Sequence, residues 1–277
     1  MVAEVFGGLW SGSLALIADA GHMAIDTAAV ALGLFALWVA RRPPNDQRTF
    51  GYYRAEILAA TVNGAGLVVV ALWIFFEAWG RASHPHPVDG SWMTVIAIGG
   101  LIVNLVGLRL VHKHADESLN MRAVTLHLLF DALGSVGAIA AGILVWVWGI
   151  VWADTVVSVL IAALILHGAY KLLVECVDIL LESVPSGVSL DTLRKDLLEV
   201  EGVIELHDLH VWSLSTGVIA LSAHLKTRDG ADHSLLLTQC TEMLHDRHEI
   251  QHATLQLEPA AYSHEDTHLD CQKKTGP

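Results

Sequence analysis

The stretch that decides the fold is LALIADAGHMAIDTAAVALGLFALWV, which covers residues 14–39. A helix needs about 20 mainly apolar residues to cross the hydrocarbon core of a bilayer, and this run is longer. It carries only three ionisable side chains, Asp19, His22 and Asp26. Because an ionisable group inside a membrane is costly to bury, such residues usually serve a function. The sequence therefore predicts a membrane-spanning helix that carries a functional polar site.

Four further apolar runs are also long enough to span a bilayer, at residues 57–79, 92–111, 119–148 and 151–174. Residues 2–10 are apolar but too few to cross on their own, and a Ser-Gly-Ser turn at 11–13 separates them from the next helix. We expect either that the first helix is incomplete or that its start lies upstream. A complete first helix would give six spans.

Composition divides the chain into a membrane part and an aqueous part. Of the 277 residues, 53% are hydrophobic and 16% are charged, whereas an average soluble domain carries about 25% charge. The apolar runs predict a transmembrane transport domain over residues 1–182, a cytoplasmic domain over 183–262 and a polar, flexible tail over 263–277. The formal net charge of −13 disfavours nucleic acid as a partner, because phosphates require basic residues.

The basic residues of the short loops predict the orientation. One pair of loops carries nearly all of them, whereas the opposite loops carry only Arg81; the basic set is Arg41, Arg42, Arg48, Arg54, Arg109, Lys113 and Arg122. Loops rich in Lys and Arg stay in the cytoplasm. We therefore expect a multi-pass protein of the cell (inner) membrane whose C-terminal domain faces the cytoplasm.

The C-terminal part alternates helical and strand patterns. Ser189 is a candidate N-cap for a helix over 190–199, and a second helix is expected over 233–247. Three strands are expected over 203–213, 218–227 and 254–258, the first two joined by a turn at 215–217. The order αββαβ predicts a small α+β domain of the ferredoxin-like kind.

Two apolar helices carry the same polar motif, HxxxD. It occurs as His22 to Asp26 and again as His127 to Asp131. A spacing of four residues places both side chains on one helix face, so two such helices could bring two imidazoles and two carboxylates together. Zinc prefers four such ligands. The alternative is a set of interhelical hydrogen bonds, but two matched pairs at membrane depth favour a metal site.

These ligands also suggest how transport could be driven. Imidazole binds metal only when neutral and carboxylate only when ionised, so metal ions and protons compete for the site. An inward proton gradient could then drive cation efflux. Asp19 lies one turn before His22 and could orient it or guide ions, whereas Asp154 and Glu77 lie near helix ends, where a charge costs little. We therefore expect no particular role for Asp154 or Glu77.

Four motifs resemble the cation diffusion facilitator family, most closely its bacterial cobalt–zinc–cadmium resistance branch: SGSLALIADAGHM (11–23), RTFGYYR (48–54), DALGSV (131–136) and HDLHVW (207–212). The resemblance extends from about residue 1 to 260. It implies an α-helical bundle of six spans, cytoplasmic termini, a homodimer and exchange of metal for protons. It also implies that His22, Asp26, His127 and Asp131 form a zinc-preferring transport site, without excluding cadmium or cobalt.

The resemblance implies a second zinc site in the cytoplasmic domain. The matching positions are His207, His224 and Glu258, with His210 as an alternative ligand. Gln256 stands where some relatives carry a further histidine, which argues against a two-metal centre. The tail residues His264, His268 and Cys271 could also capture metal.

Two rival functions fit parts of the sequence. HEIQH at 248–252 matches the HExxH pattern of metalloproteases, but it follows the expected helix and leads into a strand, which would point the two histidines apart. A membrane metal sensor that does not transport is the second rival, although a sensor has no need of HxxxD pairs at mid-membrane. We expect a transporter and not an enzyme.

Overall fold

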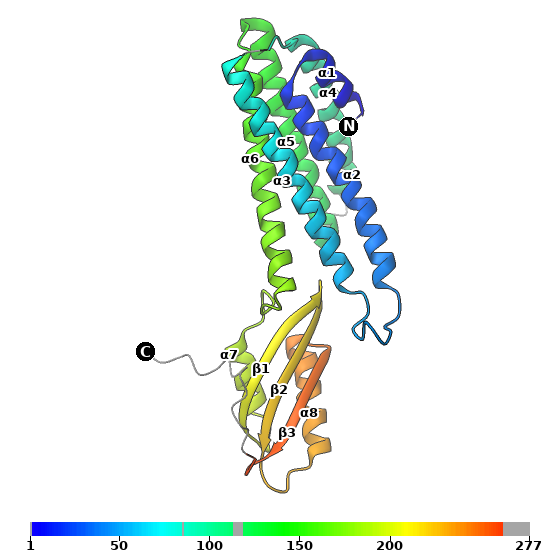
Figure 1. Cartoon of the computed structure of the whole chain (residues 1–277), viewed down its shortest axis with the longest axis vertical. Helices are drawn as coiled ribbons and strands as arrows, with labels where there is room; N and C mark the ends of the chain where they lie inside the picture. The colour runs from blue at the N-terminus through cyan, green and yellow to red at the C-terminus, as the bar shows by residue number, and fades with distance from the viewer. Residues whose placement is uncertain (1, 85, 113–118, 263–277) are drawn as a thin grey trace, which may run out of the picture. The chain divides into compact units, whose positions relative to one another are not determined.

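The computed structural model describes residues 2–84, 86–112 and 119–262, and for residues 29, 30, 111, 112, 119–128 and 130 it describes the backbone only. The chain forms two compact units. The first comprises the residues up to Phe35 together with Ala59–Leu173, and the second comprises Ala36–Leu58 together with the residues from Val174 onward. Figure 1 shows the helices of the first unit and the mixed helix–strand part of the second.

Five helices in the described part of the chain are long and apolar enough to cross a membrane. They are α2 (Leu14–Ala40), α3 (Arg54–Ser83), α4 (Gly90–His112), α5 (Leu119–Trp148) and α6 (Trp152–Leu180). Four of them contain one of the apolar runs of the sequence entirely, α6 contains all of its run except Val151, and the helices extend beyond the runs by up to six residues. The run underestimates α6 most, because its last turns are polar on one face and the apolar signal ends before the helix does.

The short first segment is a helix of its own, α1 (Val2–Ser11). It packs against α4, where Trp10 lies 6.4 Å from Trp92 between ring centroids and Gly7 faces Ile96. Gly12 then adopts a left-handed conformation with φ of +72°. A side chain there would approach the carbonyl oxygen of Pro87 to 2.7 Å, so only glycine fits this turn into α2.

Small residues allow the membrane helices to approach closely. One buried cluster joins α2, α3 and α6 and is rich in alanine, including Ala18, Ala71 and Ala162. A second cluster joins α2 to α4, α5 and α6. Between α4 and α5, Gly90 faces the backbone of Gly142 so tightly that a Cβ atom would lie 2.5 Å from the carbonyl oxygen. Small residues at helix contacts are the usual means of packing helices in lipid.

The C-terminal domain has the expected αββαβ order. It consists of α7 (Leu190–Leu198), β1 (Val203–Ser215), β2 (Val218–Thr227), α8 (His233–His248) and β3 (His252–Pro259). The sheet order is β1-β2-β3, with β1 antiparallel and β3 parallel to β2. The parallel pair requires the crossover that α8 supplies. Figure 1 shows both helices beside this sheet.

Helix caps and an apolar core hold this domain together. The Ser189 side chain accepts a hydrogen bond from the Thr192 amide and caps α7, as the sequence predicts, and Asp232 caps α8 in the same way. The core lies between the helices and one face of the sheet, with Leu221 and Leu225 fully buried. Burial raises the pKa of the Cys240 thiol in this core to about 11. The opposite face of the sheet carries the histidines.

A β-bulge in β1 decides which side chains share that face. His207 pairs with His224 and His210 pairs with Ser222, so two residues of β1 lie opposite Ala223. Asp208 takes up the extra length in a left-handed conformation, with φ of +51°. In a regular strand, residues three apart point to opposite faces. The bulge instead places His207 and His210 on the same face.

Candidate metal centres

The first centre lies within the membrane helices of the first unit. His22 and Asp26 lie one turn apart on α2, and Asp131 projects from α5. The Nε2 atom of His22 is 3.4 Å from the nearer carboxylate oxygen of Asp26 and 3.9 Å from that of Asp131. Asp131 is 9% exposed. Three of the four predicted ligands are therefore brought together from two helices that are far apart in the chain.

These separations suit a small tetrahedral ion. Zinc lies about 2.1 Å from nitrogen and oxygen ligands, so two ligand atoms of a tetrahedral site are about 3.4 Å apart. The distance between His22 and Asp26 equals this value. The distance between His22 and Asp131 is 3.9 Å, a difference that a small change of side-chain rotamer would remove. The side chain of His127, the fourth predicted ligand, lies outside the described residues. Its backbone belongs to α5, one turn before Asp131.

The second centre lies on the helix-free face of the C-terminal sheet. His207, His224 and Glu258 each offer a ligand atom, and these three atoms all lie within 4.8 Å of one another. The carboxylate of Glu258 is 3.3 Å from Nε2 of His207 and 3.2 Å from Nδ1 of His224. The two imidazole rings meet edge to face with centroids 5.3 Å apart.

The pairing of the strands explains why this cluster forms. His224 on the central strand has His207 as its neighbour on β1 and Gln256 as its neighbour on β3. Glu258 lies two residues beyond Gln256, on the same face. Its side chain is 2% exposed, and its Oε2 atom accepts no hydrogen bond within the described part of the chain. Because a buried carboxylate needs a compensating cation or donor, the donor set fits a zinc ion, which two imidazoles and one carboxylate would hold.

Two neighbours orient these ligands without joining the cluster. The amide nitrogen of Gln256 donates a 2.8 Å hydrogen bond to Oε1 of Glu258. Asp208 lies between two histidines, 2.9 Å from Nε2 of His210 and 3.7 Å from Nε2 of His224. His210 is therefore paired with Asp208. The tail residues expected to capture metal, His264, His268 and Cys271, lie outside the described residues.

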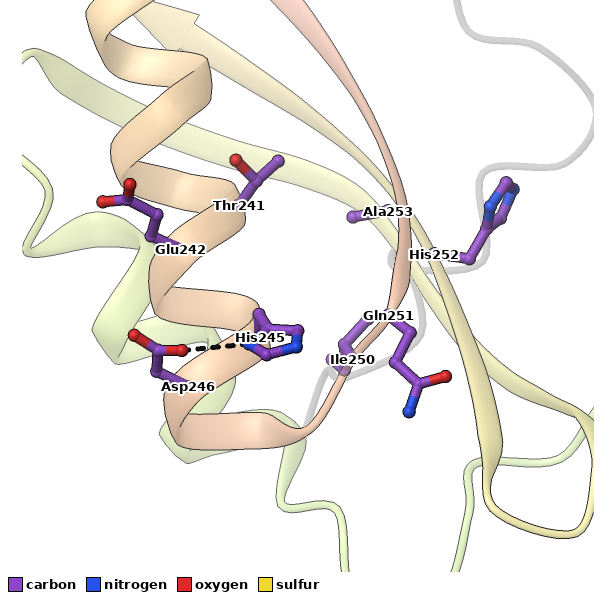
Figure 2. A pocket seen from close by; sticks show the side chains of 8 residues that line it. All are labelled: Thr241, Glu242, His245, Asp246, Ile250, Gln251, His252 and Ala253. Carbon is purple, nitrogen blue, oxygen red and sulfur yellow. Dashed lines mark hydrogen bonds and ion pairs between the residues drawn. The ribbon is translucent and has the colours of Figure 1, made fainter.

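The HExxH segment does not form a protease site. His248 ends α8, Glu249 is left-handed with φ of +54°, and His252 begins β3. His248 instead contacts Asp196 of α7 at 2.9 Å. Figure 2 shows the adjacent pocket, where the side chain of His252 points away from the helix that carries His245. A zinc protease requires both motif histidines on one helix face, and these two histidines do not share one.

Asp154 is the residue that sequence reasoning missed. Its place near a helix end suggested a charge that costs little and has no particular role, but the residue is fully buried, with 0% exposure. The carboxylate accepts hydrogen bonds from Ser13 Oγ at 2.5 Å and from the Leu14 and Ala15 amides at 2.8 and 3.1 Å. A buried and an exposed acidic residue near the start of a helix look alike in sequence.

Two family models match this chain. Residues 1–181 match the family model described as the cation efflux transmembrane domain, and residues 185–260 match the model described as the cation efflux protein cytoplasmic domain.

Three relatives cover most of this chain. The chain is 40% identical to the metal cation efflux system protein CzcD of Cupriavidus metallidurans, over 94% of its own length and 83% of that protein. It is 43% identical to the zinc transporter ZitB of Pectobacterium atrosepticum, over 93% and 81%. It is 38% identical to a cadmium, cobalt and zinc/H(+)-K(+) antiporter of Bacillus velezensis, over 99% and 89%.

Family models that together cover nearly the whole chain, and relatives of this identity, leave one assignment. The protein is a member of the cation efflux family of membrane transporters, the cation diffusion facilitators, and belongs to their bacterial cobalt–zinc–cadmium branch.

Proposed function

We propose that this protein exports zinc from the cytoplasm in exchange for protons and works as a homodimer in the cell membrane. His22, Asp26, His127 and Asp131 bind the transported ion, and cadmium and cobalt are secondary substrates. The convergence of His22, Asp26 and Asp131 inside the membrane helices is the single observation that carries this proposal. The names of the relatives, which include zinc transporters and an antiporter, support it.

Proton exchange follows from the chemistry of the ligands. Loading from the cytoplasm requires neutral imidazoles and ionised carboxylates, so zinc displaces protons from the site. On the outer side, a more acidic medium favours protonation and releases the metal. A site with two carboxylates and no cation is costly inside a membrane, so zinc and protons alternate as its compensating charge.

The second centre gives the transporter a way to respond to cytoplasmic zinc. His207, His224 and Glu258 would hold one zinc ion, which supplies two positive charges to a buried carboxylate. Binding stabilises whichever arrangement of the domain contains the complete site. We propose that this arrangement favours the dimer, so that metal level in the cytoplasm adjusts transport.

Zinc flux in proteoliposomes tests the transport function. Vesicles containing the full chain are loaded with a zinc-sensitive dye, and flux is recorded with and without an imposed pH gradient. We expect zinc flux to rise when the imposed gradient drives protons in the direction opposite to zinc. Flux that is indifferent to the gradient would reject antiport.

A pair of variants ties that flux to the proposed site. Removal of a residue that only hydrogen-bonds to a metal ligand lowers metal affinity by about 10- to 100-fold. Asp131→Asn alters a proposed ligand itself, so we expect it to reduce flux by at least that much. Asp178→Asn provides the control, since Asp178 is an exposed carboxylate on the last turns of α6. Equal flux in the two variants would remove Asp131 from the pathway.

A further inference from the structure

Asp154 is joined to the beginning of α2 by more than one kind of contact. Two amide groups in the first turn of α2 and the hydroxyl of Ser13 all donate to its carboxylate. The first turn of a helix carries unsatisfied amide groups and partial positive charge. Asp154 therefore supplies, from α6, the acceptor and the negative charge that the N-terminus of α2 needs.

Arg81 ties α3 to the same place. Its guanidinium donates a 2.6 Å hydrogen bond to the carbonyl oxygen of Gly12 and lies 3.8 Å from the carboxylate of Asp154. It also pairs with Glu77 one turn earlier on α3, at 3.1 Å. We call this group of contacts the outer joint, and it consists of residues 12–15, Arg81 and Asp154. It lies at the outer end of the bundle, because Asp154 is at the start of α6 and the cytoplasmic domain follows the other end of α6 along the chain.

Burial changes along α2 from this end to the other. Leu14, Ala15, Leu16 and Ala18 are at most 1% exposed and belong to the two clusters that join the helices. Beyond Asp26, Ala36 is the one buried side chain among those the structure describes. Gly33 lies two turns beyond Asp26 on the same face, and a Cβ atom there would meet nothing within 4 Å. The outer half of α2 is therefore held in the helix clusters, whereas the described side chains of its inner half other than Ala36 are exposed or half-buried.

We propose that Asp154 is a positioning residue for transport, which keeps the outer end of α2 attached to α6 throughout the cycle. The metal ligands on α2 then change their access by movement of the inner half of the helix about the outer joint. This inference rests on the proposed function, because His22 and Asp26 are the ligands that would move.

The chemistry of the joint favours a permanent contact over one that breaks in each cycle. Separation would leave a buried carboxylate without its donors, together with two bare amide groups, and buried polar groups without partners are expensive. His22 lies two turns from Leu14, about 12 Å along the helix at 1.5 Å per residue. A small tilt about the joint therefore displaces the ligands little and the inner end of α2 much more.

Substitution of Asp154 tests the positioning role. Asn keeps the size of the side chain but cannot accept all three hydrogen bonds, because its amide nitrogen is a donor. Misplacement of reacting groups by about 1 Å can cost on the order of 100-fold in rate, so we expect Asp154→Asn to lower the maximal zinc flux by up to that factor. The zinc concentration at half-maximal flux should stay unchanged, because the ligands themselves remain.

Asp89 provides a matched control at the same end of the bundle. It caps α4, accepts hydrogen bonds from Ser91 and Trp92, and is exposed. Asp89→Asn should transport zinc at the wild-type rate. Wild-type maximal flux in Asp154→Asn would overturn the proposal, as would a loss of flux in both variants to the same extent.

A second experiment keeps Asp154 in place and asks whether the joint opens. Ser13→Cys and Gly33→Cys are made separately in the full chain after replacement of Cys176, Cys240 and Cys271. Vesicles are treated with a membrane-impermeant thiol reagent on either side, with and without zinc and an imposed pH gradient. We expect Ser13→Cys to remain unlabelled in every condition, whereas labelling of Gly33→Cys from the cytoplasmic side changes with zinc and the gradient.

The outcomes separate this inference from the proposed function. Labelling of Ser13→Cys that rises during zinc transport would show that the joint opens, which overturns the positioning role and leaves zinc export intact. Absence of zinc flux in the wild-type protein would instead remove the proposed function, whatever the labelling shows.

Discussion

Substitution of Glu258 by Gln should nearly abolish the effect of zinc on the cytoplasmic domain. Glu258 is the only carboxylate of the His207–His224–Glu258 cluster and is 2% exposed. Gln keeps its shape but loses the negative charge and the anionic ligand atom. Because even outer-shell partners contribute about 10- to 100-fold to metal affinity, we take 100-fold as the smallest loss expected for a direct ligand.

This loss converts into a measurable change in stability. At a free zinc concentration about 100 times the wild-type dissociation constant, binding stabilises the site by about 2.7 kcal/mol. The same zinc concentration would only equal the dissociation constant of Glu258→Gln, which leaves about 0.4 kcal/mol. Amide hydrogens that exchange by opening of the sheet should therefore slow about 100-fold in the wild type and about twofold in the variant.

Hydrogen exchange of peptides from β2 and β3 provides the assay, with the full chain carrying Asp131→Asn so that the membrane site does not contribute. Glu205→Gln is the control, because Glu205 is a carboxylate of β1 that pairs with Lys226 at 2.9 Å and is not a member of the cluster. Equal protection by zinc in Glu258→Gln and in the wild type would refute the assignment of Glu258 as a ligand.

Three further outcomes follow from the same structure. Cys240, whose pKa burial raises to about 11, should hold about 100-fold less thiolate at pH 8 than an ordinary thiol and react correspondingly slowly with iodoacetamide; rapid alkylation in the folded protein would contradict its burial. Leu221→Ala, at a position with 0% exposure, should destabilise the cytoplasmic domain by about 2–5 kcal/mol, measured as faster proteolysis of that domain; resistance equal to the wild type would count against this core. Gly12→Ala, at φ of +72° with the Pro87 oxygen 2.7 Å from the added atom, should lower the thermal stability of the membrane unit in detergent, whereas Gly80→Ala, where a Cβ meets nothing within 4 Å, should not.

The membrane helices and the candidate ligands were largely predictable because two strong sequence signals agree. These signals are the long apolar runs and the HxxxD spacing inside two of them. Long apolar runs have one physical solution in a bilayer, and each run contains no more than a few polar residues that must face inward. The spacing of His22 and Asp26 was then enough to select the ligand-bearing face of α2. The structure brings His22 to 3.9 Å from Asp131 on another helix, and that these residues bind metal stays a prediction.

The features that sequence patterns did not reveal depend on contacts between distant residues. The bulge at Asp208 places His210 beside Asp208, and nothing in the alternation of HDLHVW marks the extra residue. Asp154 resembles an ordinary charge near a helix end until the start of α2 is packed against it. The parallel pairing of β3 with β2 likewise follows from the α8 crossover and not from the pattern of either strand.

X-ray absorption at the zinc edge tests the central claim most directly. The full chain carrying Glu258→Gln and His224→Ala is loaded with one zinc ion, so that the membrane site alone is occupied. We expect four nitrogen or oxygen ligands at about 2.0–2.1 Å with the scattering of two imidazoles, and one imidazole fewer after His127→Ala. A six-coordinate shell of oxygen ligands, or a spectrum that His127→Ala leaves unchanged, would contradict it.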